Sequence, residues 1–152
     1  MRILLFSDLE SQYTENFIKQ ALLPYGWEIV LISLFIPDEN KLETFKTKFA
    51  DSAIEYDTLF DKKPVRNVGK IKKVHTLLKN CRSIKKRARY LYDRYKPDVV
   101  SLQFISLYKL VFAKHIYKKC RVICSFWGSD ILRGNKFLKK YIYPKYLKKT
   151  DV

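Results

Sequence analysis

The sequence predicts an α/β domain in which helices cover both faces of a doubly wound, parallel β-sheet. Two patterns alternate along the 152 residues. Short, continuous apolar runs are typical of strands buried on both faces, and longer segments with apolar residues every three or four positions are typical of helices. Only four glycines and five prolines interrupt the chain, so regular elements should dominate. Because 47% of the residues are hydrophobic, the chain can bury the core of a single domain.

The chain opens with a strand–helix–strand unit. Residues 3–6 form the first apolar run, and residues 11–23 carry apolar side chains at helical spacing. Pro24 and Gly26 are helix-stopping residues, so the helix should end there. Residues 27–34 then form a β-branched apolar run. Two parallel strands joined by a helix make a βαβ unit, whose crossover is almost always right-handed.

The middle of the chain continues this alternation with weaker signals. Residues 37–51 place apolar side chains at helical spacing, and residues 53–56 predict a short third strand. Residues 68–95 repeat apolar positions at steps of three and four, which predicts one long helix or two. The other faces of this segment are strongly basic.

The last part of the chain predicts two more strands. They lie at residues 99–104 and 121–126, with a helix at residues 107–118 between them. An aromatic and basic helical stretch follows at residues 136–148. Repeated strand–helix alternation of this kind predicts a Rossmann-like fold over the whole chain, as one domain.

The net charge of +16 points to an acidic partner. A nucleic-acid backbone, the anionic inner leaflet of a membrane and phosphate-bearing small molecules all remain open on charge alone. Fourteen Lys or Arg residues lie between Lys62 and Lys96, beside an apolar seam. A cationic helix with such a seam is typical of proteins that adhere to anionic lipid headgroups, although the seam can equally pack on the sheet. The side chains expected on this surface are Lys72, Lys73, Lys85, Lys86, Arg87 and Arg89.

Cysteine and histidine placement argues against a metal site. Three cysteines form no CxxC pair, and neither His75 nor His115 has a Cys, Asp or Glu at ligand spacing, so no metal is expected. The first apolar run is too short for the core of a signal peptide, and no later run approaches a membrane span. We therefore expect a cytoplasmic protein, peripheral on the inner face of the membrane.

The loops that follow the strands are the expected ligand site, because open parallel sheets bind ligands at the carboxyl ends of their strands. Gly128 permits close backbone approach, and Ser129 and Asp130 can cap a helix start. Trp127 either contacts the ligand through its ring or is a buried indole in a tight turn. The residues expected to bind substrate are Ser7, Asp8, Trp127, Gly128, Ser129 and Asp130.

Two motifs carry a family resemblance. Residues 96–100, Lys-Pro-Asp-Val-Val, and the strand-to-loop segment 122–132 are separated by one helix. In this order and spacing they resemble the amino-terminal domain of bacterial glycosyltransferases of the family 4 type, which have the GT-B fold. The resemblance implies that residues 1–152 form the acceptor-side half of that fold. The pattern breaks off where another strand is expected, so we expect a truncated chain without the carboxyl-terminal donor domain.

The resemblance also implies the chemistry. It predicts transfer of a hexose-like unit from a nucleotide sugar, a co-substrate rather than a cofactor, to a cell-envelope glycan or lipid-linked acceptor, as in polysaccharide biosynthesis. It further predicts that no bound metal or cofactor is needed, and that the chain is inactive without the donor domain or a partner chain that supplies it. Relatives have glycines in the first loop, where residues 7–11 have none, and a histidine where this chain has Trp127. No catalytic residue is therefore assigned.

Two other functions compete with this one. A non-enzymatic basic module could bind nucleic acid or a protein partner through residues 62–96, but no RNA- or DNA-binding motif supports it, and nucleic acid is not favoured. A stand-alone phosphate-binding enzyme ranks last, because the chain has no GxGxxG motif, P-loop or nucleophile elbow.

Overall fold

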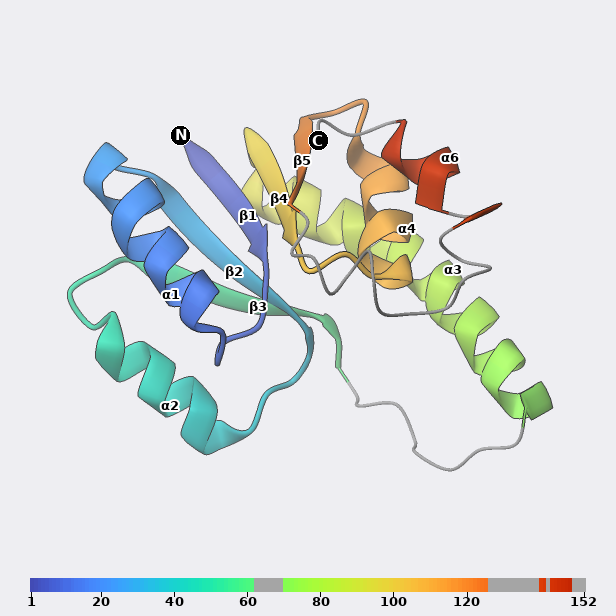
Figure 1. Cartoon of the computed structure of the whole chain (residues 1–152), viewed down its shortest axis with the longest axis horizontal. Helices are drawn as coiled ribbons and strands as arrows, with labels where there is room; N and C mark the ends of the chain where they lie inside the picture. Colours follow the sequence, from blue (N-terminus) through green and yellow to red (C-terminus); the bar gives the residue numbers. More distant parts are fainter. Residues whose placement is uncertain (62–69, 126–139, 142, 149–152) are drawn as a thin grey trace.

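Five parallel strands form one sheet in the computed structural model, which describes residues 1–61, 70–125, 140–141 and 143–148. The strands are β1 (Arg2–Phe6), β2 (Glu28–Phe35), β3 (Ile54–Phe60), β4 (Val99–Gln103) and β5 (Arg121–Ser125). Their order in the sheet is β3-β2-β1-β4-β5. The chain therefore winds outward from β1 in one direction and then returns to wind outward in the other. This is the doubly wound, Rossmann-like sheet that the sequence predicts (Figure 1).

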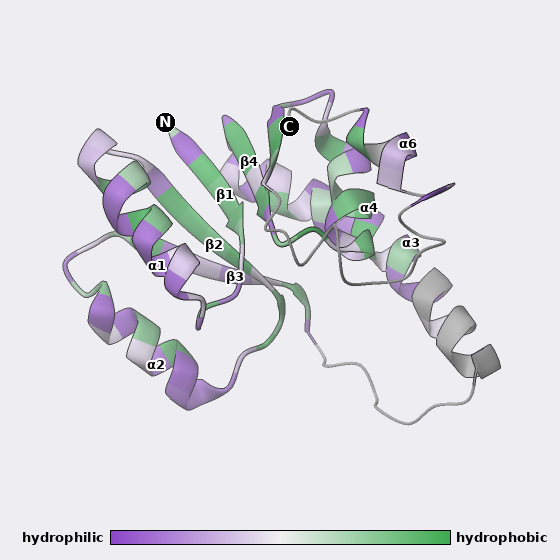
Figure 2. Cartoon of the chain, in the orientation of Figure 1, coloured by the Kyte–Doolittle hydropathy of each residue, from purple (hydrophilic) through white to green (hydrophobic). Residues whose placement is uncertain are grey.

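Helices cover both faces of the sheet (Figure 1). The helical segments are α1 (Gln12–Phe17), η1 (Ile18–Leu22), η2 (Leu23–Tyr25), α2 (Glu39–Lys48), α3 (Lys70–Tyr95), α4 (Leu107–Ile116) and α6 (Tyr143–Leu147). One face of the sheet carries α1, η1 and α2, and the other carries α3 and α4. Figure 2 shows hydrophobic strands at the centre and hydrophilic positions on the outer helices.

Alternation along β1 divides the core into two layers. Ile3 and Leu5 pack with η1 and α2, whereas Leu4 and Phe6 pack with α3 and α4. All four side chains are at most 3% exposed, which is why the run carries no polar residue. Burial on both faces places β1 at the centre of the sheet.

The basic segment forms one helix. In α3 the seam residues Ile84, Ala88, Leu91 and Tyr95 are buried against the sheet. The helix ends at Tyr95, and the next residue, Lys96, has a left-handed φ of 42° and donates its N–H to the Tyr92 carbonyl at 2.7 Å. Its amino-terminal turns extend past the carboxyl ends of the strands (Figure 1).

The structure differs from the sequence expectation in two elements. The predicted helix at residues 11–23 is divided, because α1 passes into the π-helical turn η1 and the 3-10 turn η2, and Pro24 has no N–H to continue the ladder. The third strand runs to Phe60 rather than residue 56, since β3 pairs with β2 from Ile54 as far as Phe60. The sequence underestimates the length of β3 because an edge strand tolerates polar residues, which interrupt the apolar pattern used to predict strands.

Candidate functional site

A cleft of about 650 Å³ opens at the carboxyl ends of β1, β2 and β4. It is lined by residues 8–11 and Tyr13 after β1, residues 33–38 at the end of β2, Lys41 of α2, and Phe104 after β4. Strands β1 and β4 are neighbours at which the chain changes its winding direction. The cleft therefore lies at the topological switch point, where sheets of this type bind ligands.

Of the two residues predicted to bind substrate in the first loop, Asp8 lines the cleft and Ser7 supports it from below. Asp8 is exposed and lines the cleft. Ser7 is only 1% exposed, and its hydroxyl donates to Gln103 Oε1 at 2.9 Å and hydrogen-bonds with the Thr14 hydroxyl. Because these three residues belong to the β1 loop, β4 and α1, Ser7 fixes the wall of the cleft from inside the protein.

A buried lysine beneath the cleft was not expected from the sequence. Lys109 of α4 is 2% exposed, and its Nζ donates to the carbonyls of Phe6, at 3.4 Å, and Gln103. These carbonyls belong to the last residues of β1 and β4. An ammonium group there joins the two strand ends and satisfies acceptors that would otherwise be desolvated. The available signal was a single lysine among apolar residues in the segment 107–113 of α4.

The backbone is strained at Phe104, which lines the cleft directly after β4. Phe104 has a φ of 55°, in the left-handed region that L-residues avoid at a cost of roughly 1–2 kcal/mol. It follows β4 directly and lines the cleft. The Lys109 ammonium, bonded to the preceding carbonyl, helps to hold this turn. Strained residues concentrate at ligand sites, and this one presents an aromatic ring at the switch point.

The cleft is acidic although the chain as a whole is basic. Among the described residues that line it, three carry carboxylates, Asp8, Glu10 and Asp38, and Lys41 carries the one ammonium group. Lys41 pairs with Glu10, whose hydrogen bond raises the pKa of that ammonium. Asp38 caps α2 by accepting the Asn40 N–H at 3.3 Å.

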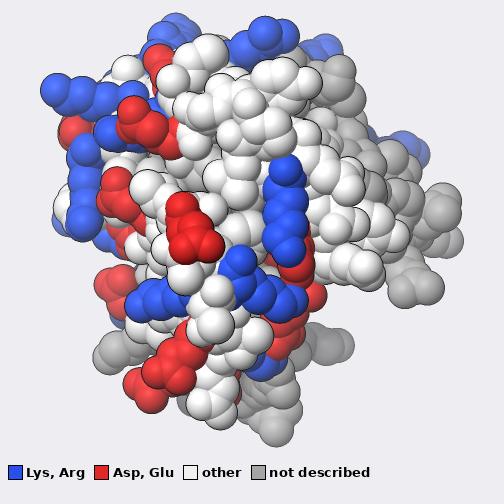
Figure 3. Space-filling model, turned by 90° about the vertical axis from the view of Figure 1, so that its left-hand side faces the viewer, with Lys and Arg blue, Asp and Glu red and all other residues white. Residues whose placement is uncertain are grey.

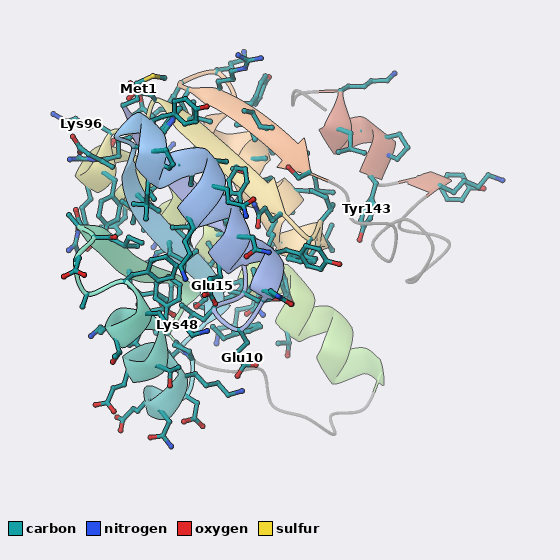
Figure 4. The ribbon with its side chains drawn as sticks, turned by 60° about the vertical axis from the view of Figure 1, so that its left-hand side comes forward. Met1, Glu10, Glu15, Lys48, Lys96 and Tyr143 are labelled. Atoms are coloured by element: carbon teal, nitrogen blue, oxygen red, sulfur yellow. The ribbon has the colours of Figure 1, made fainter. Side chains whose placement is uncertain are left out.

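Ion pairs tie the elements beside the cleft together. Figure 4 shows Glu10 in the loop after β1, and Glu15 of α1 near Lys48 of α2. Glu15 accepts from Lys19 at 2.8 Å and from Lys48 at 2.7 Å. These hydrogen bonds, from Lys19 first and then Lys48, lower the pKa of Glu15 to about 2.

A family model described as glycosyl transferase 4-like matches residues 2–152. The chain belongs to this family. No curated protein sequence matches it well enough to identify a relative. Solved structures share the fold of this glycosyl transferase 4-like chain at low identity.

A UDP-GlcNAc 2-epimerase from Neisseria meningitidis, bound to UDP-GlcNAc, is 14% identical with a TM-score of 0.60. That match covers 99% of this chain and 38% of the epimerase. The apo UGT2 of Phytolacca americana is 10% identical with a TM-score of 0.54, over 82% of this chain and 29% of that one. The chain thus spans well under half the length of these proteins, and the likeness shows the fold alone.

The second expected ligand loop of this glycosyl transferase 4-like chain follows β5. Strand β5 ends at Ser125, and the four predicted residues Trp127, Gly128, Ser129 and Asp130 lie outside the described residues. In the described part of the chain, no group of three or more His, Cys, Asp or Glu side chains is placed to hold a metal ion.

The six residues predicted to form the cationic surface differ in their exposure and in their partners. Lys85, Lys86 and Arg89 are exposed on α3, and no described carboxylate pairs with them. Arg87 instead turns toward the sheet, where its guanidinium pairs with Asp57 of β3. Lys72 and Lys73 lie in the first turns of α3, with side chains outside the described part.

The pKa of His115 in α4 shows that cations of α3 and α4 lie close together. Burial is the main factor that lowers the pKa of His115, and the nearby charges of Lys114, Lys85 and Arg89 lower it further. Lys114 of α4 and Lys85 and Arg89 of α3 therefore all lie near His115. Over the described residues, no helix is long and apolar enough to cross a membrane.

Charge is divided unequally along the chain. Residues 1–61 carry five Lys or Arg against eleven Asp or Glu, whereas residues 62–152 carry 26 against four. The first segment builds α1, α2 and the cleft side of the sheet, where Figure 3 shows acidic and basic side chains interspersed. The second segment builds α3 and α4. The fold therefore places a basic layer, α3 and α4, on one face of the sheet, whereas α1, η1 and α2 on the other face carry both signs.

Proposed function

We propose that residues 1–152 form the acceptor-side domain of a glycosyltransferase, and that the cleft at the ends of β1, β2 and β4 receives the acceptor. Membership of the glycosyl transferase 4-like family supports glycosyl transfer in general. The observation that carries the proposal is the position of the cleft at the switch point of the sheet, above the buried Lys109 and beside the strained Phe104. A preformed floor of this kind orients a substrate at little entropic cost.

In this proposal the sugar nucleotide is held by a second domain, in the same protein or in a partner chain. The cleft itself argues for this division, because its carboxylates repel a diphosphate. Residues 1–152 alone should then turn over no sugar nucleotide. Release of nucleoside diphosphate by the purified chain, above the rate of a heat-denatured sample, would contradict this division of labour.

The basic layer is proposed to hold the domain against an anionic membrane, where a lipid-linked or cell-envelope acceptor would be reached. Lys85, Lys86 and Arg89 are exposed, and Lys114 of α4 lies with Lys85 and Arg89 around His115. Each Lys or Arg near an anionic bilayer surface contributes about 1 kcal/mol to binding. Three such residues account for about 3 kcal/mol, or roughly a 100-fold change in partition.

Co-sedimentation with anionic and neutral vesicles across a salt series tests the membrane part. Lys85, Lys86 and Arg89 are changed together to Glu, and Arg87 is kept because it is paired with Asp57. The control reverses three exposed cations on the opposite face of the sheet, Lys19, Lys46 and Lys48. Because Lys19 and Lys48 pair with Glu15, circular dichroism must show that this control variant is folded.

Binding to anionic vesicles should fall by at least about 100-fold in the α3 variant and much less in the control. Absence of binding at low salt, or equal losses in both variants, would refute membrane attachment through α3. Salt-dependent binding to a polynucleotide without any vesicle binding would favour the nucleic-acid module instead.

A further inference from the structure

The charge of the cleft bears on which acceptors it can take. Its described lining holds three carboxylates and one ammonium group, and the ammonium of Lys41 is already paired with Glu10. The exposed carboxylate of Asp8 has no hydrogen-bond donor among the described residues. Carboxylate oxygens accept hydrogen bonds from hydroxyl and amine groups, and they repel phosphate and carboxylate groups.

Apolar side chains line the same cleft. Tyr13 is 56% exposed and Ile36 is 48% exposed, and Phe104 lies at the end of β4. Apolar and aromatic side chains beside a few polar groups in a cleft are typical of sites for small organic ligands. A ring that has C–H groups on its faces and hydroxyls around its edge satisfies both the apolar surfaces and the carboxylates.

We propose that the cleft selects an acceptor whose entering unit is an uncharged or amine-bearing sugar, and that it rejects a unit carrying phosphate or carboxylate. The proposal rests on the acceptor-side function given above and adds the substrate class to it. In it, Asp8 accepts a hydrogen bond from the sugar and is the main source of repulsion toward anions. Asp38 caps α2, and Glu10 is balanced by Lys41, so both contribute less.

The test compares three probes on the 152-residue chain: a methyl glucoside, the methyl glycoside of glucosamine, and a methyl glucuronide. The Ile36 δ-methyl NMR signal reports occupation of the cleft, and titration gives a dissociation constant for each probe. A charge of the same sign held some 6–8 Å away at a partly exposed site should weaken binding of the glucuronide by about fivefold or more. The two other probes should bind equally well, or the amine more tightly.

Two variants locate the source of the discrimination. Asp8→Asn keeps the size of the side chain and should bring the glucuronide to within about twofold of the glucoside. Glu43→Gln removes an equal charge from an exposed position of α2 outside the cleft, and it should preserve the full difference.

The outcomes separate this inference from the function on which it rests. If all three probes shift the Ile36 signal with equal affinity, the charge preference is wrong and the acceptor cleft stands. If discrimination persists in Asp8→Asn, Asp8 is not its source and the inference also fails. If no probe shifts the signal up to its solubility limit, the proposed function itself is contradicted.

Discussion

The ion pair between Arg87 and Asp57 should hold α3 on the edge of the sheet. Arg87 Nη2 pairs with Asp57, and Arg87 Nε donates to the Thr58 carbonyl at 2.9 Å. Tyr95 of the same helix donates its hydroxyl to the other oxygen of Asp57 at 3.1 Å. The exposed fractions of the Arg87 and Asp57 side chains are 24% and 14%, so water screens the pair only in part.

The expected cost of removing Arg87 follows from this burial. Breaking a fully buried ion pair costs about 3–5 kcal/mol, because a charge is left without a partner. Since both side chains keep some contact with water, and Tyr95 still donates to Asp57, we expect about 2–3 kcal/mol for Arg87→Met. For a chain of 152 residues this corresponds to a fall in Tm of roughly 5–10 °C.

Urea unfolding followed by circular dichroism would measure this in Arg87→Met, Asp57→Asn and the double variant. We expect a coupling energy of about 1.5 kcal/mol between the two positions. Arg89→Met is the matched control, because Arg89 is exposed and should change stability by no more than about 0.5 kcal/mol. Single-variant losses that simply add, or equal losses at Arg87 and Arg89, would refute a stabilising ion pair.

Three further predictions concern single positions. Gly26→Ala should cost about 1 kcal/mol in thermal unfolding, because Gly26 has a φ of 67° although nothing lies within 4 Å of an added Cβ; an unchanged Tm would contradict this. Burial first and Asp57 second raise the pKa of Tyr95 to about 12, so the fold retains a proton that the unfolded chain loses near pH 10. Stability should therefore fall between about pH 10 and pH 12, and a Tyr95→Phe variant that lost stability equally over this range would show that Tyr95 is not responsible. Burial, and then Asp98, raise the pKa of the Cys120 thiol to about 11, so iodoacetamide should modify it more slowly near neutral pH in the folded chain than in urea; equal rates by mass spectrometry would argue against this.

Strand positions could be predicted because burial on both faces leaves a local signature. Residues 3–6 are apolar throughout, and residues 99–104 are apolar except for Ser101 and Gln103, which are buried; both runs became inner strands, β1 and β4. The third strand was predicted too short, because an edge strand keeps one side open and tolerates Glu55 and Asp57. For the site, the rule that ligands bind at strand ends led to Asp8, which lines the cleft.

Side-chain roles at the site could not be predicted in the same way. Ser7 was expected to bind substrate, and the structure places its hydroxyl in a buried network with Thr14 and Gln103. Gln103 lies 96 residues away in the sequence, so no local pattern links the two. Arg87 was counted with the cations of the surface, and its partner Asp57 lies on a different element.

The sequence by itself determined the fold class and the excess of positive charge, because strand and helix periodicity and net charge are properties of near neighbours and of composition. The tertiary structure decided which charges remain on the surface and which are used inside. It also decided that Lys109 joins the ends of β1 and β4, and that carboxylates gather around a cleft in a basic protein. These outcomes depend on strand order, which brings Phe6 and Gln103 together across 97 residues of chain, and burial then fixes their polar partners.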